Sequence, residues 1–129
     1  MKNRLYIFLI VLFFSCAAKS NESSTVVLYH KLNDKYTFKI EDVISDSRCP
    51  KNKNCVWEGQ VELIISIYEN ENFLNNEILV LNAKNLEINK GILEKYTLNK
   101  KIISIQIHPE KNQENKMELN SYYLEIIVE

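Results

Sequence analysis

Two cysteines near the middle of the sequence have the residue type and spacing to do chemistry together. Cys49 and Cys55 are separated by five residues, all of them Pro, Lys or Asn. Such a pair can form a disulfide, bind a metal ion as thiolates or act as a redox couple. Structural zinc sites favour shorter Cys spacings with two further ligands nearby, and redox pairs usually have two intervening residues. The spacing therefore favours a disulfide that closes a tight loop, with a metal site or a redox pair as the alternatives.

Candidates for catalysis are few. His30 ends a predicted strand and His108 precedes Pro109, so we interpret both histidines as edge or turn residues. The sequence contains no nucleophile, zinc-protease, phosphate-loop or dinucleotide motif. A carboxylate pair could still be assembled from four acidic residues that lie close in sequence: Asp42, Asp46, Glu58 and Glu62. We predict no catalytic residue, no metal ligand and no cofactor.

The residues that follow the second cysteine suggest local roles. Trp57 comes two positions after Cys55, so in a strand the two side chains would point to the same side, and we expect Trp57 to pack on the core near the disulfide. The alternative is an exposed ring that anchors a binding partner. Gly59 predicts a bulge or a close backbone approach where the next strand begins.

Arg48 precedes the first cysteine and is the only arginine after Arg4. We expect a bidentate salt bridge from Arg48 to Asp46, Glu58 or Asp42, which would lock the base of the loop. The alternative is capture of an anionic ligand by the guanidinium group.

The elements that position these residues are predicted to be strands, because apolar residues recur at every second position. One face of a long strand carries Val61, Leu63, Ile65 and Ile67, and its other face is also partly apolar, so we expect this strand to be central. The same alternation places Tyr36, Phe38 and Ile40 on one face, Ile103, Ile105 and Ile107 on another, and Tyr122, Leu124, Ile126 and Val128 on a third. Further strands are predicted at Val26–Leu32 and Glu77–Asn82, with a weaker candidate at Leu93–Leu98.

Polar segments separate these strands, at Asn33–Lys35, Asn70–Asn76, Asn82–Gly91 and Glu110–Lys116. Only Ala83–Tyr96 has apolar residues spaced for a short helix. About seven closely spaced strands predict an all-β fold, an antiparallel β-sandwich, with a small β-barrel as the alternative. We expect a single β-sandwich domain over residues 25–129.

Composition excludes some classes of protein. The formal net charge of the 129 residues is −1, and it becomes −3 without Lys2 and Arg4, since 14 basic residues then face 17 acidic ones. No clustered basic surface is indicated, so we expect no nucleic-acid partner. The hydrophobic fraction of 46% is too high for a disordered chain.

The N-terminus has the organisation of an export signal. Lys2 and Arg4 precede ten apolar residues, Leu5–Phe14, and small Ser15 then precedes Cys16. As a helix the apolar run would span about 15 Å, half the hydrocarbon core of a bilayer. Residues 12–16 are similar to a bacterial lipobox, so we predict a signal peptide at 1–15 and lipidation of Cys16 with acyl chains such as palmitate. The alternative is cleavage near Ala17 or Ala18 without lipid.

If Cys16 carries lipid, Cys49 and Cys55 remain as an even pair in an oxidising compartment, which also favours the disulfide. Residues 16–24 have no apolar periodicity and are predicted to form a flexible tether. No Asp follows Cys16 directly, which is similar to Gram-negative lipoproteins sorted to the outer membrane. We expect a lipid-anchored envelope protein, with a soluble periplasmic or secreted protein as the alternative.

The string Asp46-Ser47-Arg48-Cys49-Pro50, followed by Cys55, Trp57 and Gly59 in a C-x-W-x-G pattern, resembles a signature of small, uncharacterised secreted proteins and lipoproteins of Bacteroidetes-type bacteria. The resemblance extends over most of 25–129. Its C-terminal portion has a strand, a Pro turn, a polar stretch and a final strand. His108 stands where an aromatic residue is more usual. The resemblance implies an envelope location but no reaction, so it marks Asp46, Arg48, Pro50, Trp57 and Gly59 as motif residues with structural roles.

We therefore expect a non-enzymatic binding module, tethered to the membrane by its N-terminal lipid, that binds another envelope protein, a peptide or a glycan. The alternative is an inhibitor or recognition protein that acts through the disulfide-closed loop 49–55, because a preorganised loop loses little entropy on binding. A hydrolase is the third possibility.

Overall fold

The computed structural model describes residues 26–28, 30–112 and 117–129. This part of the chain is all-β, with six strands in two antiparallel three-stranded sheets of order β1-β6-β5 and β2-β3-β4. The elements are β1 (Val26–Leu28), β2 (Tyr36–Asp46), β3 (Val61–Glu69), β4 (Asn72–Leu81), α2 (Leu86–Glu94), β5 (Ile102–His108), the short 3-10 helix η2 (Leu119–Ser121) and β6 (Tyr123–Val128). The predicted all-β class is confirmed, and the described residues form six strands where about seven were expected.

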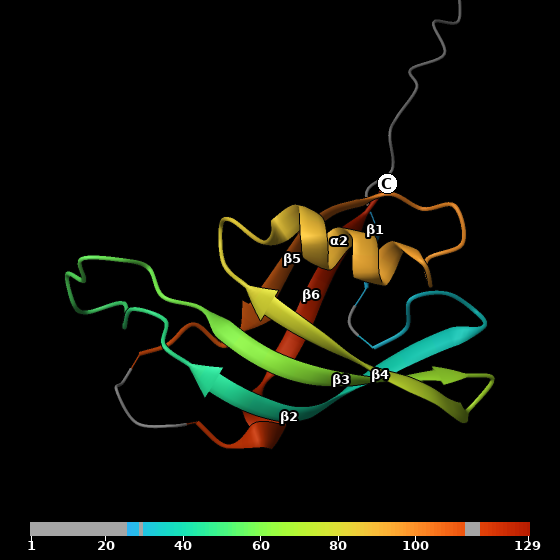
Figure 1. The fold of residues 1–129 in the computed structure, drawn as a ribbon, viewed down its shortest axis with the longest axis horizontal. Helices are drawn as coiled ribbons and strands as arrows, with labels where there is room; N and C mark the ends of the chain where they lie inside the picture. Colours follow the sequence, from blue (N-terminus) through green and yellow to red (C-terminus); the bar gives the residue numbers. More distant parts are fainter. Residues whose placement is uncertain (1–25, 29, 113–116) are drawn as a thin grey trace, which may run out of the picture.

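The two sheets enclose one hydrophobic core. In Figure 1 the strands of the β2-β3-β4 sheet cross those of the β1-β6-β5 sheet, and α2 lies at the side where β4 and β5 meet. Strand β3 is central in its sheet, as predicted, and the side chains of Val61, Leu63, Ile65 and Ile67 are fully buried. The other sheet contributes to the same core Ile102, Ile105, Leu124, Ile126 and Val128.

Strand β2 continues past Glu41, where the predicted alternation stops, and ends five residues later at Asp46. Its pairing with β3 shifts register between Ile40 and Asp42, and again between Val43 and Ser45. Each β-bulge adds one residue and reverses which face the following side chains occupy. Val43 is therefore buried although it is out of phase with Ile40, and this is why period-two alternation did not reveal the second half of the strand.

The predicted polar break at Asn70–Asn76 is wrong beyond its first two residues. Asn70 and Glu71 have φ angles of 47° and 69° and form a two-residue hairpin turn, and Asn72 already pairs with Glu69. Positive φ at both central positions matches the twist of antiparallel strands, and asparagine tolerates this conformation. Polar residues continue β4 here because the ladder is formed by backbone groups.

The weak strand candidate at Leu93–Leu98 is also wrong, and Ala83–Tyr96, the only segment in which the sequence left room for a short helix, contains α2. Leu93 is buried in the last turn of α2, and Leu98 has a φ of 47°, which a strand does not allow. The helix is fastened to β4 by Asn89, whose amide nitrogen donates to Val80 O at 2.8 Å and whose Oδ1 accepts from Val80 N at 3.2 Å.

Two other strands differ in detail from the prediction. The predicted strand Val26–Leu32 is described as β1 over three residues, after which Lys31 bridges to Thr37 of the other sheet. In β5, a register shift between Ile102 and Ser104 places Ile103 outward with 39% of its surface exposed. The expectation that Ile103 shares a buried face with Ile105 is therefore wrong, because the bulge reverses the phase.

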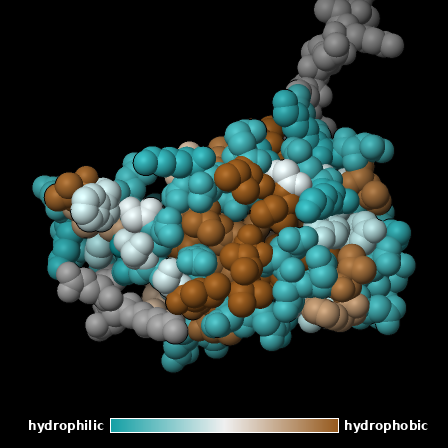
Figure 2. All heavy atoms as spheres, viewed as in Figure 1, coloured by the Kyte–Doolittle hydropathy of each residue, from teal (hydrophilic) through white to brown (hydrophobic). Residues whose placement is uncertain are grey.

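The outer face of the β2-β3-β4 sheet carries an apolar patch, which Figure 2 shows in brown near the centre of the view. Ile64 of β3 pairs with Ile78 of β4, which is 53% exposed, and Ile44 of β2 is 47% exposed.

Among the described residues, no helix has the length and apolar character needed to traverse a lipid bilayer.

Candidate functional site

The candidate site is the connection between β2 and β3, residues Ser47–Gln60, which we call the arm. Figure 1 shows the arm extending sideways, away from both sheets. Its base continues the β2–β3 pairing: Ser47 N donates to Gln60 O at 2.8 Å, and Cys49 N donates to Glu58 O at 2.9 Å. Ser47 Oγ also donates to Gln60 O at 3.2 Å and accepts from Gln60 N at 3.1 Å. The arm therefore leaves the fold as two hydrogen-bonded segments.

Gly59 allows these segments to approach. Its φ is +74°, and a Cβ atom at this position would lie 1.9 Å from the carbonyl oxygen of Ser47. Glycine alone combines this conformation with this contact. The predicted close backbone approach at Gly59 is confirmed.

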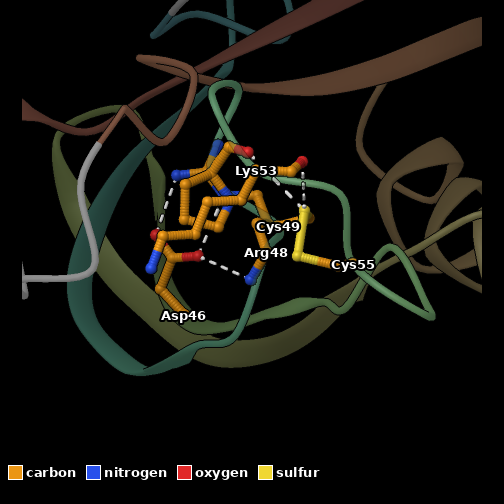
Figure 3. Close-up of a disulfide and its surroundings, with 6 residues drawn as sticks. Asp46, Arg48, Cys49, Lys53 and Cys55 are labelled. Atoms are coloured by element: carbon orange, nitrogen blue, oxygen red, sulfur yellow. Dashed lines mark hydrogen bonds and ion pairs between the residues drawn. A yellow bond between two sulfur atoms is a disulfide. The ribbon is translucent and has the colours of Figure 1, made fainter.

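The predicted disulfide is confirmed between Cys49 and Cys55, whose Cα atoms are 5.9 Å apart (Figure 3). Pro50, inside the ring, is buried, and its carbonyl oxygen accepts from Lys53 N at 3.0 Å to form a turn. In the part of the chain that the structure describes, no group of three or more His, Cys, Asp or Glu side chains could hold a metal ion.

Arg48 and Asp46 lock the base of the arm, as Figure 3 shows. Arg48 Nε donates to Asp46 Oδ1 at 2.9 Å and Nη2 donates to Oδ2 at 2.8 Å, so the predicted bidentate salt bridge is confirmed with Asp46 as the partner. Arg48 Nη1 donates to Pro109 O at 2.9 Å, just beyond β5. The hydroxyl of Tyr122 donates to Asp46 Oδ2 at 2.9 Å. Because all three guanidinium nitrogens are engaged, Arg48 holds the arm and is poorly placed to capture an anion.

The charge of Asp46 depends on this network. Burial by itself would raise the pKa of the Asp46 carboxyl, but hydrogen bonds from Arg48 and Tyr122, with the charge of Arg48, outweigh burial and lower it. For Tyr122, burial first and the hydrogen bond to Asp46 second raise the pKa to about 12. At neutral pH the site therefore contains a carboxylate, a guanidinium and a neutral phenol, which is a structural ion pair with a neutral donor.

A second set of contacts braces the arm against the segment that follows β5. Lys51 N donates to Lys111 O at 2.9 Å, and Lys51 Nζ pairs with Glu110 Oε2 at 2.5 Å. Lys111 Nζ donates to the backbone oxygen of Asp46 at 2.7 Å. These contacts join residues about sixty positions apart, so the orientation of the arm is set by the tertiary structure.

Just after the disulfide-closed ring, the arm exposes two apolar side chains: Val56 is 93% exposed and Trp57 is 79% exposed. The prediction that Trp57 packs on the core is wrong. Strand β3 begins only at Val61, so strand alternation does not apply at Trp57, and Cys55 is itself exposed. The alternative interpretation of the sequence, an exposed aromatic anchor, agrees with this geometry.

An open cleft of about 500 Å³ lies beside Trp57. The arm forms one side of the cleft, and the segment that follows β4 forms the other. Its lining residues are Ser47, Trp57, Glu58, Gly59, Gln60, Asn82, Ala83 and Lys84. No sequence pattern pointed to Asn82 or Lys84, because neither belongs to the cysteine motif and only the folded sheet brings them next to the arm.

The remaining candidates for catalysis are dispersed. His30 is exposed beside Phe38, while His108 stacks on Tyr123 with ring centroids 5.0 Å apart and has its Nε2 3.0 Å from Glu125 Oε2. Among the acidic candidates, Asp42 Oδ1 accepts from Val43 N, Asp46 binds Arg48, and Glu58 lines the cleft. Glu62 pairs with Ser45 across β2 and β3. These contacts bring no two of the four carboxylates together as a hydrogen-bonded pair.

The predicted signal peptide at 1–15, the lipid-accepting Cys16 and the tether 16–24 lie outside the described residues. No protein-family model, curated protein or solved structure matches this chain.

Proposed function

We propose that this protein is a non-enzymatic binding module of the bacterial cell envelope, and that the arm is its recognition element. The observation that carries the proposal is the exposure of Val56 and Trp57 directly after the disulfide-closed ring of a braced segment. Large exposed apolar side chains are unfavourable in water, and tryptophan is enriched among residues that dominate binding energies.

The way the arm is held supports this proposal. Its base is fixed by the Arg48–Asp46 salt bridge, its ring by the disulfide, and its flank by the contact of Lys51 with Lys111. A segment ordered before binding loses little conformational entropy when a partner docks. This rigidity has a clear use if Trp57 must be presented to a partner.

The location is part of the same proposal. Cys16 receives lipid before residues 1–15 are removed, residues 16–24 tether the domain to the membrane, and the outer membrane is the destination that we favour over a soluble periplasmic or secreted form. The Cys49–Cys55 disulfide supports an oxidising compartment, and the resemblance of the cysteine motif to envelope proteins agrees with it. Mass spectrometry of the protein purified from its native cell would test this, because an unmodified Cys16 would contradict lipidation.

A second candidate is an inhibitor whose arm enters a cleft of another protein. The observation that favours it is the projection of the arm away from the sheets in Figure 1. In that case one captured partner would be an enzyme, and addition of the purified protein would reduce its activity.

The test is affinity capture from the native envelope with three forms of the full-length, lipidated protein. These are the wild type, Trp57→Ala and, as a matched control, Ile88→Ala, which removes a side chain of 64% exposure from α2. Because hot-spot residues contribute about 2 kcal/mol or more, we expect Trp57→Ala to weaken binding of the captured partner by roughly thirtyfold. Ile88→Ala should bind as the wild type does. Equal capture by wild type and Trp57→Ala would contradict the proposal.

A further inference from the structure

We infer that the ligand of the arm is a neutral glycan, with a sugar ring stacked on Trp57 and its hydroxyl groups bound in the cleft beside it. This inference rests on the proposed function and names the chemical class of the ligand at the same site. It depends on two features of one open cleft. The cleft has an exposed indole ring, and it has both hydrogen-bond donors and acceptors that are available to a ligand.

The indole provides the stacking surface. Trp57 is 79% exposed and lines a cleft of about 500 Å³, a volume within the range of small-ligand sites. A pyranose ring has a face of C–H groups, which packs against the negative face of an aromatic ring. Tryptophan offers the largest such face, and its indole N–H supplies a donor at the edge.

The opposite side of the cleft is held in place by an amide pair. Asn82 Nδ2 donates to Gln60 Oε1 at 2.9 Å, while Asn82 Oδ1 accepts from Lys84 N at 2.9 Å and from Asn85 N at 2.8 Å. The Asn82 side chain is therefore fixed by the turn after β4. Within the described part of the chain, no partner takes the hydrogens of Gln60 Nε2, so this amide remains a donor available to a ligand.

Two charged groups complete the cleft. Glu58 and Lys84 both line it, and no side-chain hydrogen bond or ion pair joins either of them to another described residue. The cleft therefore offers an acceptor at Glu58 and donors at Gln60, Lys84 and Trp57. Sugar hydroxyls both donate and accept, so they can use both kinds of group.

The same groups disfavour other ligands. One carboxylate and one ammonium give the cleft no net charge, so it has no electrostatic preference for an anionic ligand. The buried centre of a protein–protein interface is depleted of charged residues, whereas here the groups adjacent to Trp57 are charged or amide side chains. A neutral, hydroxyl-rich ligand satisfies them without leaving a buried charge.

The test uses the fluorescence of Trp57, the only tryptophan in the chain. The full-length protein, extracted in detergent, is titrated with cellohexaose, chitohexaose, maltohexaose and laminarihexaose. At least one should shift the emission to shorter wavelength in a saturable way, because stacking removes water from the indole. By calorimetry, Trp57→Ala should abolish binding of that saccharide and Glu58→Gln should weaken it about tenfold. The matched control Glu87→Gln, an exposed carboxylate of α2 paired with Lys90, should leave affinity unchanged.

The outcomes separate this inference from the proposed function. If no saccharide binds, or if binding is unaffected by Trp57→Ala or by Glu58→Gln, the glycan inference fails. If, in that case, capture of an envelope protein still depends on Trp57, the proposed function stands with a protein as the ligand. If capture does not depend on Trp57 either, both fail.

Discussion

Asp46 is the residue through which the arm is joined to both sheets. It is the last residue of β2, its carboxylate accepts from Arg48 and from Tyr122, and its backbone oxygen accepts from Lys111. A buried carboxylate is costly unless it is paired and hydrogen-bonded, and here each oxygen has a donor. The D-S-R-C motif is thus explained by the geometry at the base of the arm.

Gly59 is the residue at which a small change should have the largest structural effect. In Gly59→Ala the new methyl group would meet the Ser47 carbonyl at a φ that disfavours any side chain. We expect the free energy of unfolding to fall by at least about 2 kcal/mol in urea titrations, from backbone strain and overpacking together.

The matched control is Gly91→Ala in α2, where an added Cβ would have no neighbour within 4 Å. Because alanine is a better helix former than glycine, this variant should gain about 0.5–1 kcal/mol. Similar stabilities for the two variants would show that the contact at Gly59 does not constrain the arm.

At the scale of elements, the arm is stabilised separately at its base and in its ring. The base hydrogen bonds between Ser47 and Gln60 do not involve the disulfide, and the Cys49–Cys55 bond closes a ring of seven residues further out. The ring should therefore be removable without loss of the two sheets, since neither cysteine belongs to the core cluster.

We expect the double variant Cys49→Ser, Cys55→Ser to keep the circular dichroism of the wild type and to lose about 2 kcal/mol of stability, the value that chain-entropy arguments give for a loop of this length. Reduction of the wild type with dithiothreitol should produce the same loss, and it should have no effect on the double variant. Complete unfolding of the double variant would mean that the disulfide supports the sheets and not the arm alone.

At the scale of the whole molecule, the Asp46–Arg48–Tyr122 network connects the stability of the fold to pH. Tyr122 is 6% exposed, and its pKa is raised by burial and by Asp46 to about 12. The folded state thus retains the phenolic proton in a range where the unfolded chain has released it. Tyr122 therefore contributes to the free energy of unfolding an amount that is fully present below about pH 10 and is lost as the pH rises towards about 12.

We predict that the wild type loses about 2 kcal/mol of stability between pH 10 and pH 12 at this site, and that Tyr122→Phe removes this part of the pH dependence. The pKa of Tyr96 is also raised, by burial and by a hydrogen bond to Glu77, so Tyr96 contributes to the alkaline loss of stability that remains in Tyr122→Phe. At low pH the dependence has the opposite sign. The pKa of Asp46 is lowered in the folded state, so the stability that Asp46 contributes is lost as the pH falls and its carboxylate is protonated. Denaturant titrations across pH would contradict the prediction if the alkaline limbs of wild type and Tyr122→Phe were parallel.

Local patterns in the sequence were sufficient for much of the fold. The alternation in β3 and β6 identified which side chains are buried, because neither strand has a bulge within its apolar run. The alternation failed in β2 and at Ile103 of β5, where a bulge reverses the phase. A bulge depends on the partner strand as much as on the residue itself, so period-two reasoning cannot locate it.

By itself, the sequence determined the all-β class, favoured the disulfide and a salt bridge of Arg48 with a nearby carboxylate, and marked Gly59 as a bulge or a close backbone approach, because these follow from periodicity and from residue types close in the chain. The structure decided that Asp46 is the partner of Arg48 and that Gly59 lies against Ser47. Only the tertiary structure decided that Trp57 is exposed, that Pro109 and Lys111 brace the arm, and that Asn82 and Lys84 lie beside it. These features depend on contacts between segments that are distant in the chain, and such contacts exist only once the two sheets have packed.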